Sequence, residues 1–175
     1  MTDIERLPDP GPVLTNLPRG AGVILRHPDA HQLKQLAKRI LPHARTLGLK
    51  VLIANDIRLA LRVRADGVHM SEQAARRGPM RITSRPPGFI ITAAAHGALA
   101  IHHASHAGAQ AVLVSPVFPT ASHPQIKPLG IVRFSYLVRQ GRLAVIALGG
   151  IRTSNIHHLT LSRAYGFAAI GAWLN

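Results

Sequence analysis

The chain has 175 residues, of which 47% are hydrophobic and only 4% aromatic, so it can form one domain with an aliphatic core. It has no cysteine, which excludes disulfides and thiolate chemistry. Its formal net charge of +14 would attract polyanions, but the Lys and Arg residues are scattered and few aromatic rings could stack on bases, so nucleic-acid binding is not expected. No secretory signal or membrane-spanning apolar run is visible, and we expect a cytoplasmic protein with no membrane contact.

Short apolar runs alternate with amphipathic segments along the chain. Seven strands are predicted, starting near residues 22, 50, 67, 89, 111, 143 and 166. Helices are expected over 29–47, 57–64, 71–77, 98–107, 131–139 and 153–163. This alternation with short turns predicts parallel βαβ units within a single domain that covers residues 1–175.

The stretch from Ala111 to Gly130 has the pattern of a buried strand followed by a functional loop. The apolar run ends after Val114, because Pro116 and Pro119 cannot continue the hydrogen bonding of a central strand. The residues that follow are polar and interrupted by proline. Loops at the carboxyl ends of barrel strands look like this, and they build the active sites of such folds.

Several motifs in fixed order resemble the thiamine phosphate synthase and thiazole tautomerase family. They are VILRHPD, IANDIRLALRVRADGVHM, VSPVFPTAS, KPLGI, and ALGGI followed by GFAAIGAW. The resemblance implies an α/β fold of the (β/α)8 TIM-barrel type. Since only seven strands are predicted, the first strand would be truncated to an ending at Thr2-Asp3, and the final helix would be missing.

The resemblance implies an enzyme that joins hydroxymethylpyrimidine pyrophosphate to thiazole phosphate and releases pyrophosphate, with these small phosphorylated molecules as its partners. Arg26 matches an arginine that contacts the pyrophosphate, and Asn55, Thr120 and Ser122 match polar positions of the same subsite. Asp56 matches the first metal-binding aspartate, so Mg²⁺ is the implied cofactor.

The thiazole phosphate would lie at the other end of the site. Gly149, Gly150, Ile170 and Gly171 match the family's residues there. Glycine allows the backbone to approach a phosphate closely, so that N–H groups can bind it.

The chain departs from the family pattern at several of these positions. The second metal-binding aspartate is replaced by Ala74, and the serine before His96 by Ala94. The lysine beside the loop hydroxyls is replaced by His123, and the tautomerase histidine by Pro116. The catalytic set of the synthase is therefore incomplete.

Two alternatives to the synthase activity remain open. One is a tautomerase-like isomerase that uses His96 or His123 as its base. The other is a catalytically degenerate barrel that binds a phosphorylated ligand. An open barrel edge would also expose apolar surface, which Trp173 and Leu174 or a second copy in a homo-oligomer could cover.

Overall fold

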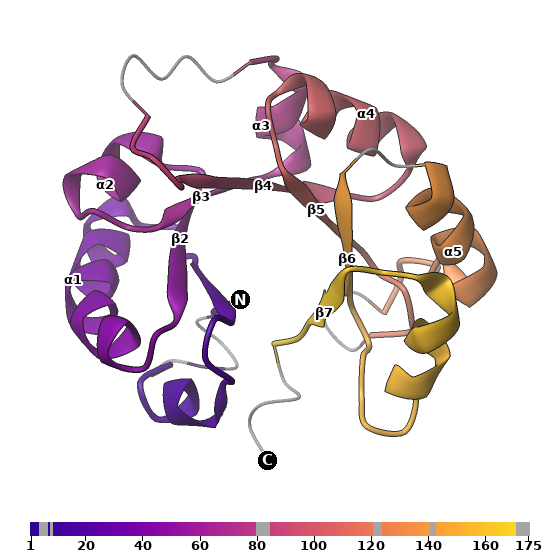
Figure 1. Ribbon diagram of the computed structural model, residues 1–175, viewed down its shortest axis with the longest axis horizontal. Helices are drawn as coiled ribbons and strands as arrows, with labels where there is room; N and C mark the ends of the chain where they lie inside the picture. Colours follow the sequence, from indigo (N-terminus) through magenta and orange to yellow (C-terminus); the bar gives the residue numbers. More distant parts are fainter. Residues whose placement is uncertain (4–6, 8, 80–84, 121–123, 141–142, 171–175) are drawn as a thin grey trace.

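A computed structural model of the protein describes residues 1–3, 7, 9–79, 85–120, 124–140 and 143–170. Seven parallel strands form one curled sheet in which the spatial order follows the chain, and the helices lie outside it (Figure 1). The strands are β1 (Gly22–Leu25), β2 (Lys50–Ala54), β3 (Gly67–Met70), β4 (Ile90–Ala95), β5 (Ala111–Val114), β6 (Ala144–Leu148) and β7 (Gly166–Ala168). All seven predicted strands are therefore confirmed.

The α-helices are α1 (Ala30–Thr46), α2 (Ile57–Arg62), α3 (Glu72–Arg76), α4 (Ala98–His106) and α5 (Gly130–Gln140), and two 3₁₀ helices are η1 (Pro12–Asn16) and η2 (Ile156–Ser162). The predicted N-cap Asp29 accepts a hydrogen bond from the Gln32 N–H at 2.7 Å. Among the described helices, none is long and apolar enough to cross a membrane.

The prediction of an α-helix over 153–163 was wrong in the type of helix and in the residue at which it starts. The segment forms the 3₁₀ helix η2, and its N-cap is Asn155 rather than Thr153 or Ser154. The Asn155 side chain does not cap η2, because its Oδ1 accepts from the Arg152 N–H and its Nδ2 donates to the Gly150 carbonyl. The sequence also did not predict η1.

The sheet packs apolar side chains on both of its faces, which explains the almost continuous apolar runs of its strands. One large cluster fills the space between the strands and the surrounding helices, with Phe134 and Ile53 completely buried. A second, smaller cluster lies on the other face of the sheet, with Ile24, Leu52, Ala54 and Leu113 at its centre.

Residues 1–3 connect the two edges of the curled sheet. The Thr2 N–H donates to the carbonyl of Ile24 on β1 at 2.8 Å, and the Met1 amino group lies 3.4 Å from the carbonyl of Ala169, just after β7. The described part of the chain thus forms a seven-stranded half-barrel whose open side is bridged by its own first residues. Trp173 and Leu174, expected to cover this side, lie outside the described residues.

Candidate active site

Most of the predicted site residues that the structure describes lie directly after the carboxyl ends of strands. Arg26 follows β1, Asn55 follows β2, His96 follows β4, and Gly149 follows β6. Because all seven strands are parallel and neighbours in chain order, these ends share one edge of the sheet. Ser122, His123 and Gly171 lie outside the described residues.

Asn55 is held in place by its backbone and by its side chain. Its N–H donates to the carbonyl of His69 at 2.8 Å, and its Oδ1 accepts from the Ser71 N–H at 2.6 Å. Its φ of 56° lies in the left-handed region, which asparagine tolerates better than most residues. The Asn55 side chain therefore connects the ends of β2 and β3, and its amide nitrogen stays at the exposed surface.

Asp56 is the N-cap of α2. Its Oδ1 accepts a hydrogen bond from the Leu59 N–H at 2.8 Å, which satisfies one of the free donors at the helix start. No other described residue donates to its Oδ2. If Asp56 binds a metal ion as predicted, it can offer only Oδ2 freely, because Oδ1 already accepts from the Leu59 N–H.

Glu72 connects the start of α3 to the end of β4. Its Oε2 accepts from Nδ1 of His96 at 2.6 Å, and its Oε1 accepts from Arg76 at 2.6 Å. Burial alone would raise the pKa of Glu72, but the hydrogen bonds and charges of His96 and Arg76 outweigh burial and lower it. Glu72 is therefore an ionised carboxylate that orients the His96 ring.

The carboxylates at this edge do not fit a magnesium site built from two aspartates. Mg²⁺ requires a near-octahedral set of oxygen ligands. Asp56 is a single carboxylate, both oxygens of Glu72 are taken by side-chain donors, and the position of the expected second ligand is Ala74. Within the described ranges, no group of three or more acidic, His or Cys side chains could hold a metal ion.

His69 is a site residue that the sequence analysis missed. It lies in the middle of β3, buried on the same face as the smaller core cluster, with its Nδ1 2.8 Å from the hydroxyl of Thr92 on β4. Burial, with the charges of the N-terminus and Arg26, lowers its pKa to about 4. The sequence predicts a short strand over GVHM and assigns no role to its histidine.

The loop after β5 packs tightly on the end of β6. The N–H groups of Val117 and Phe118 donate to the carbonyls of Leu148 and Gly149 at 3.0 and 3.1 Å. Gly149 and Gly150 have φ values of +92° and +68°, and a Cβ on Gly149 would lie only 2.8 Å from Cα of Pro116. The two predicted glycines are therefore required by the backbone of this turn. Thr120 lies in the same loop.

The N–H groups of Gly150 and Ile151 donate to no other residue in the described part of the chain. Successive free N–H groups in a turn with positive φ form a concave site for an anion. Asn155, which the sequence analysis also missed, fixes this turn by donating to the Gly150 carbonyl at 2.8 Å.

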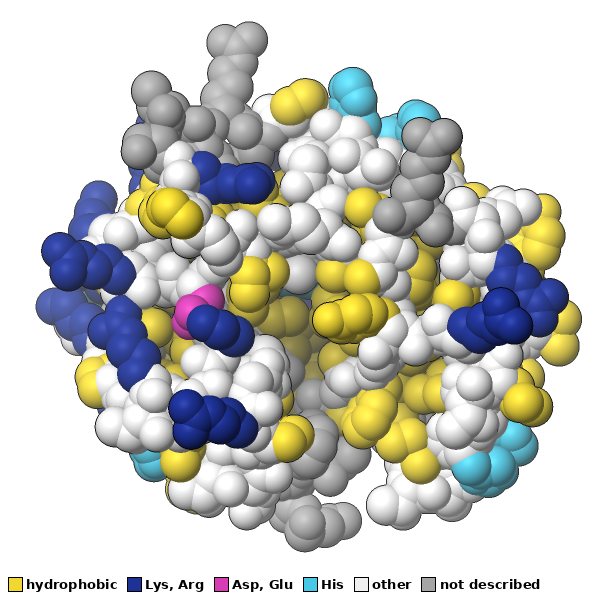
Figure 2. Space-filling model, viewed as in Figure 1, with side chains coloured by type: hydrophobic (Ala, Val, Ile, Leu, Met, Phe, Trp, Pro, Cys, Tyr) yellow, Lys and Arg dark blue, Asp and Glu magenta, His cyan; other side chains and the backbone are white. Residues whose placement is uncertain are grey.

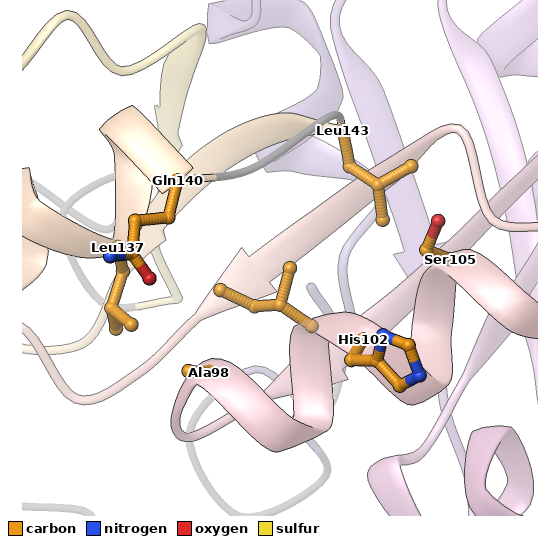
Figure 3. Close-up of a pocket in the computed structure, with 7 residues that line it drawn as sticks. Ala98, His102, Ser105, Leu137, Gln140 and Leu143 are labelled. Carbon is orange, nitrogen blue, oxygen red and sulfur yellow. The ribbon is translucent and has the colours of Figure 1, made fainter.

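Ile170 lies at a different place from the two glycines. It lines a groove of about 180 Å³ on the open side of the half-barrel, together with Met1 and Phe167. A second groove, of about 220 Å³, is lined by His102 and Ser105 of α4 and by Leu137 and Gln140 of α5 (Figure 3). None of the predicted site residues lines this second groove.

Comparison with known proteins shows the family to which the chain belongs. The sequence model of the family described as thiamine monophosphate synthase matches residues 15–173. A putative thiamine-phosphate synthase 2 of Aquifex aeolicus is 33% identical over 144 residues, which cover 82% of this chain and 76% of that protein. The thiamine-phosphate synthase of Bacillus velezensis is 30% identical, but the match covers 78% of this chain and only 61% of that protein.

Solved structures show the same fold. A thiamine phosphate pyrophosphorylase from Pyrococcus furiosus superimposes with a TM-score of 0.74 at 20% identity, covering 97% of this chain and 82% of that one. A structure described as native KDPGal superimposes with a TM-score of 0.64 at 16% identity, covering 94% of this chain and 78% of that one. At such identities the likeness concerns the arrangement of strands and helices.

Proposed function

Because the chain belongs to the thiamine monophosphate synthase family, we propose that it is a transferase that joins hydroxymethylpyrimidine pyrophosphate to thiazole phosphate in thiamine biosynthesis. The observation that carries the proposal is the pair of N–H groups at Gly150 and Ile151, which donate to no residue that the structure describes. They lie at the carboxyl end of β6, where a barrel commonly binds a phosphate. The phosphate of the thiazole would bind there.

The pyrimidine pyrophosphate would bind at the ends of β1, β2 and β4. Arg26 would donate to its phosphate oxygens, and the amide nitrogen of Asn55 and the ring of His96 are further donors at this edge. When pyrophosphate leaves, negative charge develops on it, and donors that are already in place stabilise that charge. Thr120 and Ser122 of the loop after β5 complete this subsite in our proposal.

We also propose that residues 1–3 occupy the position of the first strand of a (β/α)8 barrel. Their hydrogen bonds to Ile24 and Ala169 support this position. The Thr2 side chain adds a further contact, because its Oγ1 accepts from the Arg26 N–H at 2.9 Å. The start of the chain would then position the backbone of a substrate-binding arginine.

A coupled assay tests the synthase activity. The purified chain, incubated with both substrates and Mg²⁺, is expected to form thiamine phosphate and pyrophosphate. The matched control is Gly150→Ala, in which the added Cβ would collide with the loop carbonyls of Phe118 and Pro119. Thiazole phosphate is expected to raise the melting temperature of the wild type more than that of this variant. A wild type that neither turns over nor binds thiazole phosphate would refute the proposal.

The contact between Glu72 and His96 favours one second candidate, the tautomerase-like isomerase. A carboxylate that accepts from Nδ1 of a histidine fixes the orientation of the ring and leaves Nε2 to face a substrate, as an acid–base reaction requires. An isomerase would exchange a substrate proton with solvent. Deuterium incorporation into a thiazole phosphate carboxylate, lost in His96→Gln, would identify this activity.

The third candidate is a barrel that binds a phosphorylated ligand without catalysis. It is supported by the alanines at positions 74 and 94, where the family has catalytic side chains. It predicts a thermal shift with thiazole phosphate and no product from either reaction.

A further inference from the structure

The acidic side chains at the ends of β2 and β3 are already engaged by the protein. Asp56 caps α2 through Oδ1, and Glu72 is bound on both oxygens, by His96 and by Arg76. Only 18% of the Glu72 side chain is exposed, so solvent ions compete poorly for it. A divalent cation at this edge would have to displace an ion pair to gain a second carboxylate.

Positive groups, by contrast, are abundant on the chain as a whole, and Arg26 brings one to this edge. Arg26 is exposed after β1, and 54% of the His96 side chain is exposed after β4. The chain carries 21 Lys and Arg against 7 Asp and Glu, and one face of the molecule shows many dark blue side chains and hardly any magenta (Figure 2). An anion therefore meets the guanidinium of Arg26 and the ring of His96 at this edge without a metal ion.

We propose that this site binds the diphosphate group of its substrate without a resident magnesium ion, with the guanidinium of Arg26 and the imidazole of His96 as its donors. Glu72 is a positioning residue in this arrangement. It accepts from Nδ1 of His96, so the ring keeps a fixed orientation and its Nε2 remains available to a phosphate oxygen. The inference rests on the proposed function, because it concerns the same substrate.

Calorimetric titration of the full chain with inorganic pyrophosphate tests the proposal, once in EDTA and once with excess Mg²⁺. We expect pyrophosphate to bind in EDTA, with a Kd less than about threefold weaker than in Mg²⁺, which corresponds to under about 0.7 kcal/mol. A weakening of about threefold or more in EDTA, or binding only with Mg²⁺, would overturn it.

Two variants make the test specific for the named residues. His96→Gln removes the imidazole ring and is expected to weaken pyrophosphate binding in EDTA by about tenfold. His106→Gln, at the far end of α4, removes another exposed histidine and is expected to change the affinity by less than about twofold. Equal affinities of the two variants would overturn the role of His96.

Ala74→Asp restores a carboxylate at the position where the family has one. With Asp56 it would supply two carboxylates, so the variant is expected to bind pyrophosphate at least about tenfold more tightly in Mg²⁺ than in EDTA. If the variant binds pyrophosphate with the same Kd in Mg²⁺ and in EDTA, the missing carboxylate at position 74 does not explain why the wild type binds without the metal.

Thiazole phosphate separates this inference from the proposed function. If thiazole phosphate raises the melting temperature but pyrophosphate binding requires Mg²⁺, only the metal-independent site is refuted. If neither compound binds in either buffer, the proposed function fails together with the inference.

Discussion

Gly150 faces the carbonyl oxygen of Pro119 so closely that no side chain fits between them. The contact joins the end of β6 to the loop after β5, and the hydrogen bond from Phe118 N to Gly149 O lies beside it. The anion site proposed at Gly150 and Ile151 therefore depends on the packing of two neighbouring strand ends.

Gly150→Ala is expected to destabilise the protein by at least about 2 kcal/mol, because the residue has a φ of +68° and its Cβ would overlap the loop backbone. Urea unfolding measures the loss. Gly166→Ala in β7 is the matched control, since its Cβ would meet no atom within 4 Å and its φ is not positive. We expect the control to change stability by less than about 0.5 kcal/mol. Equal losses in the two variants would contradict the close packing.

His69 is expected to make the protein less stable as the pH falls. Its pKa is about 4 in the folded chain and about 6.5 in the unfolded chain, so the unfolded state binds the proton first. The stability contribution is complete above about pH 6.5 and is lost as the pH falls toward 4, with an upper limit of roughly 3 kcal/mol.

Urea unfolding of the wild type and His69→Gln at pH 7.5 and pH 5 measures this effect. Gln cannot titrate but retains a polar group for the hydroxyl of Thr92. The difference in stability between the two pH values should be smaller in the variant. A variant with the pH dependence of the wild type would show that His69 does not titrate as a buried group.

Substitutions of Asp56 separate its structural role from ligand binding. Asp56→Ala removes the cap of α2 and should cost about 1 kcal/mol, whereas Asp56→Asn keeps an oxygen for the Leu59 N–H and should cost less. Asp29→Ala removes the cap of α1 and provides a control with a similar cost. If Asp56 serves only as a cap, Asp56→Asn should bind pyrophosphate as the wild type does, which calorimetry can determine.

Substitutions of Asn55 test its two roles separately. Asn55→Gly relieves the φ of 56° but loses the hydrogen bond to Ser71, whereas Asn55→Ala loses the bond and retains the strain. We expect the alanine variant to be less stable than the glycine variant by about 1 kcal/mol in chemical unfolding. The reverse order would show that the left-handed conformation costs nothing at this position.

The strands could be predicted from the sequence because the sheet is buried on both faces, and apolar runs such as KVLIA mark such strands directly. The same apolar runs show where each strand ends, so the sequence could place Asn55 directly after β2 and His96 directly after β4. The contact of His96 with Glu72 could not be predicted from the sequence. It joins residues 24 apart in the chain that meet only after β3 and β4 pair.

Other features depend on tertiary contacts that no local pattern shows. The periodicity of residues 153–163 predicts an α-helix, but Asn155 uses its side chain to hold Gly150 and Arg152, and the chain forms a 3₁₀ helix instead. His69 has the sequence context of a core residue, and only its pairing with Thr92 shows that it is a buried polar group on the inner face.

The contact between Met1 and Ala169 joins residues 168 apart, whereas every strand of the sheet pairs with the strand that precedes or follows it in the chain. Each βαβ unit can therefore form from a short loop at a low entropic cost, while the contact at the open side must bring together the two most distant parts of the sheet. We expect the sheet to assemble by successive addition of neighbouring strands, with the bridge by residues 1–3 forming last. In native-state hydrogen exchange, the N–H of Thr2 should then be among the first of the hydrogen-bonded amides to exchange.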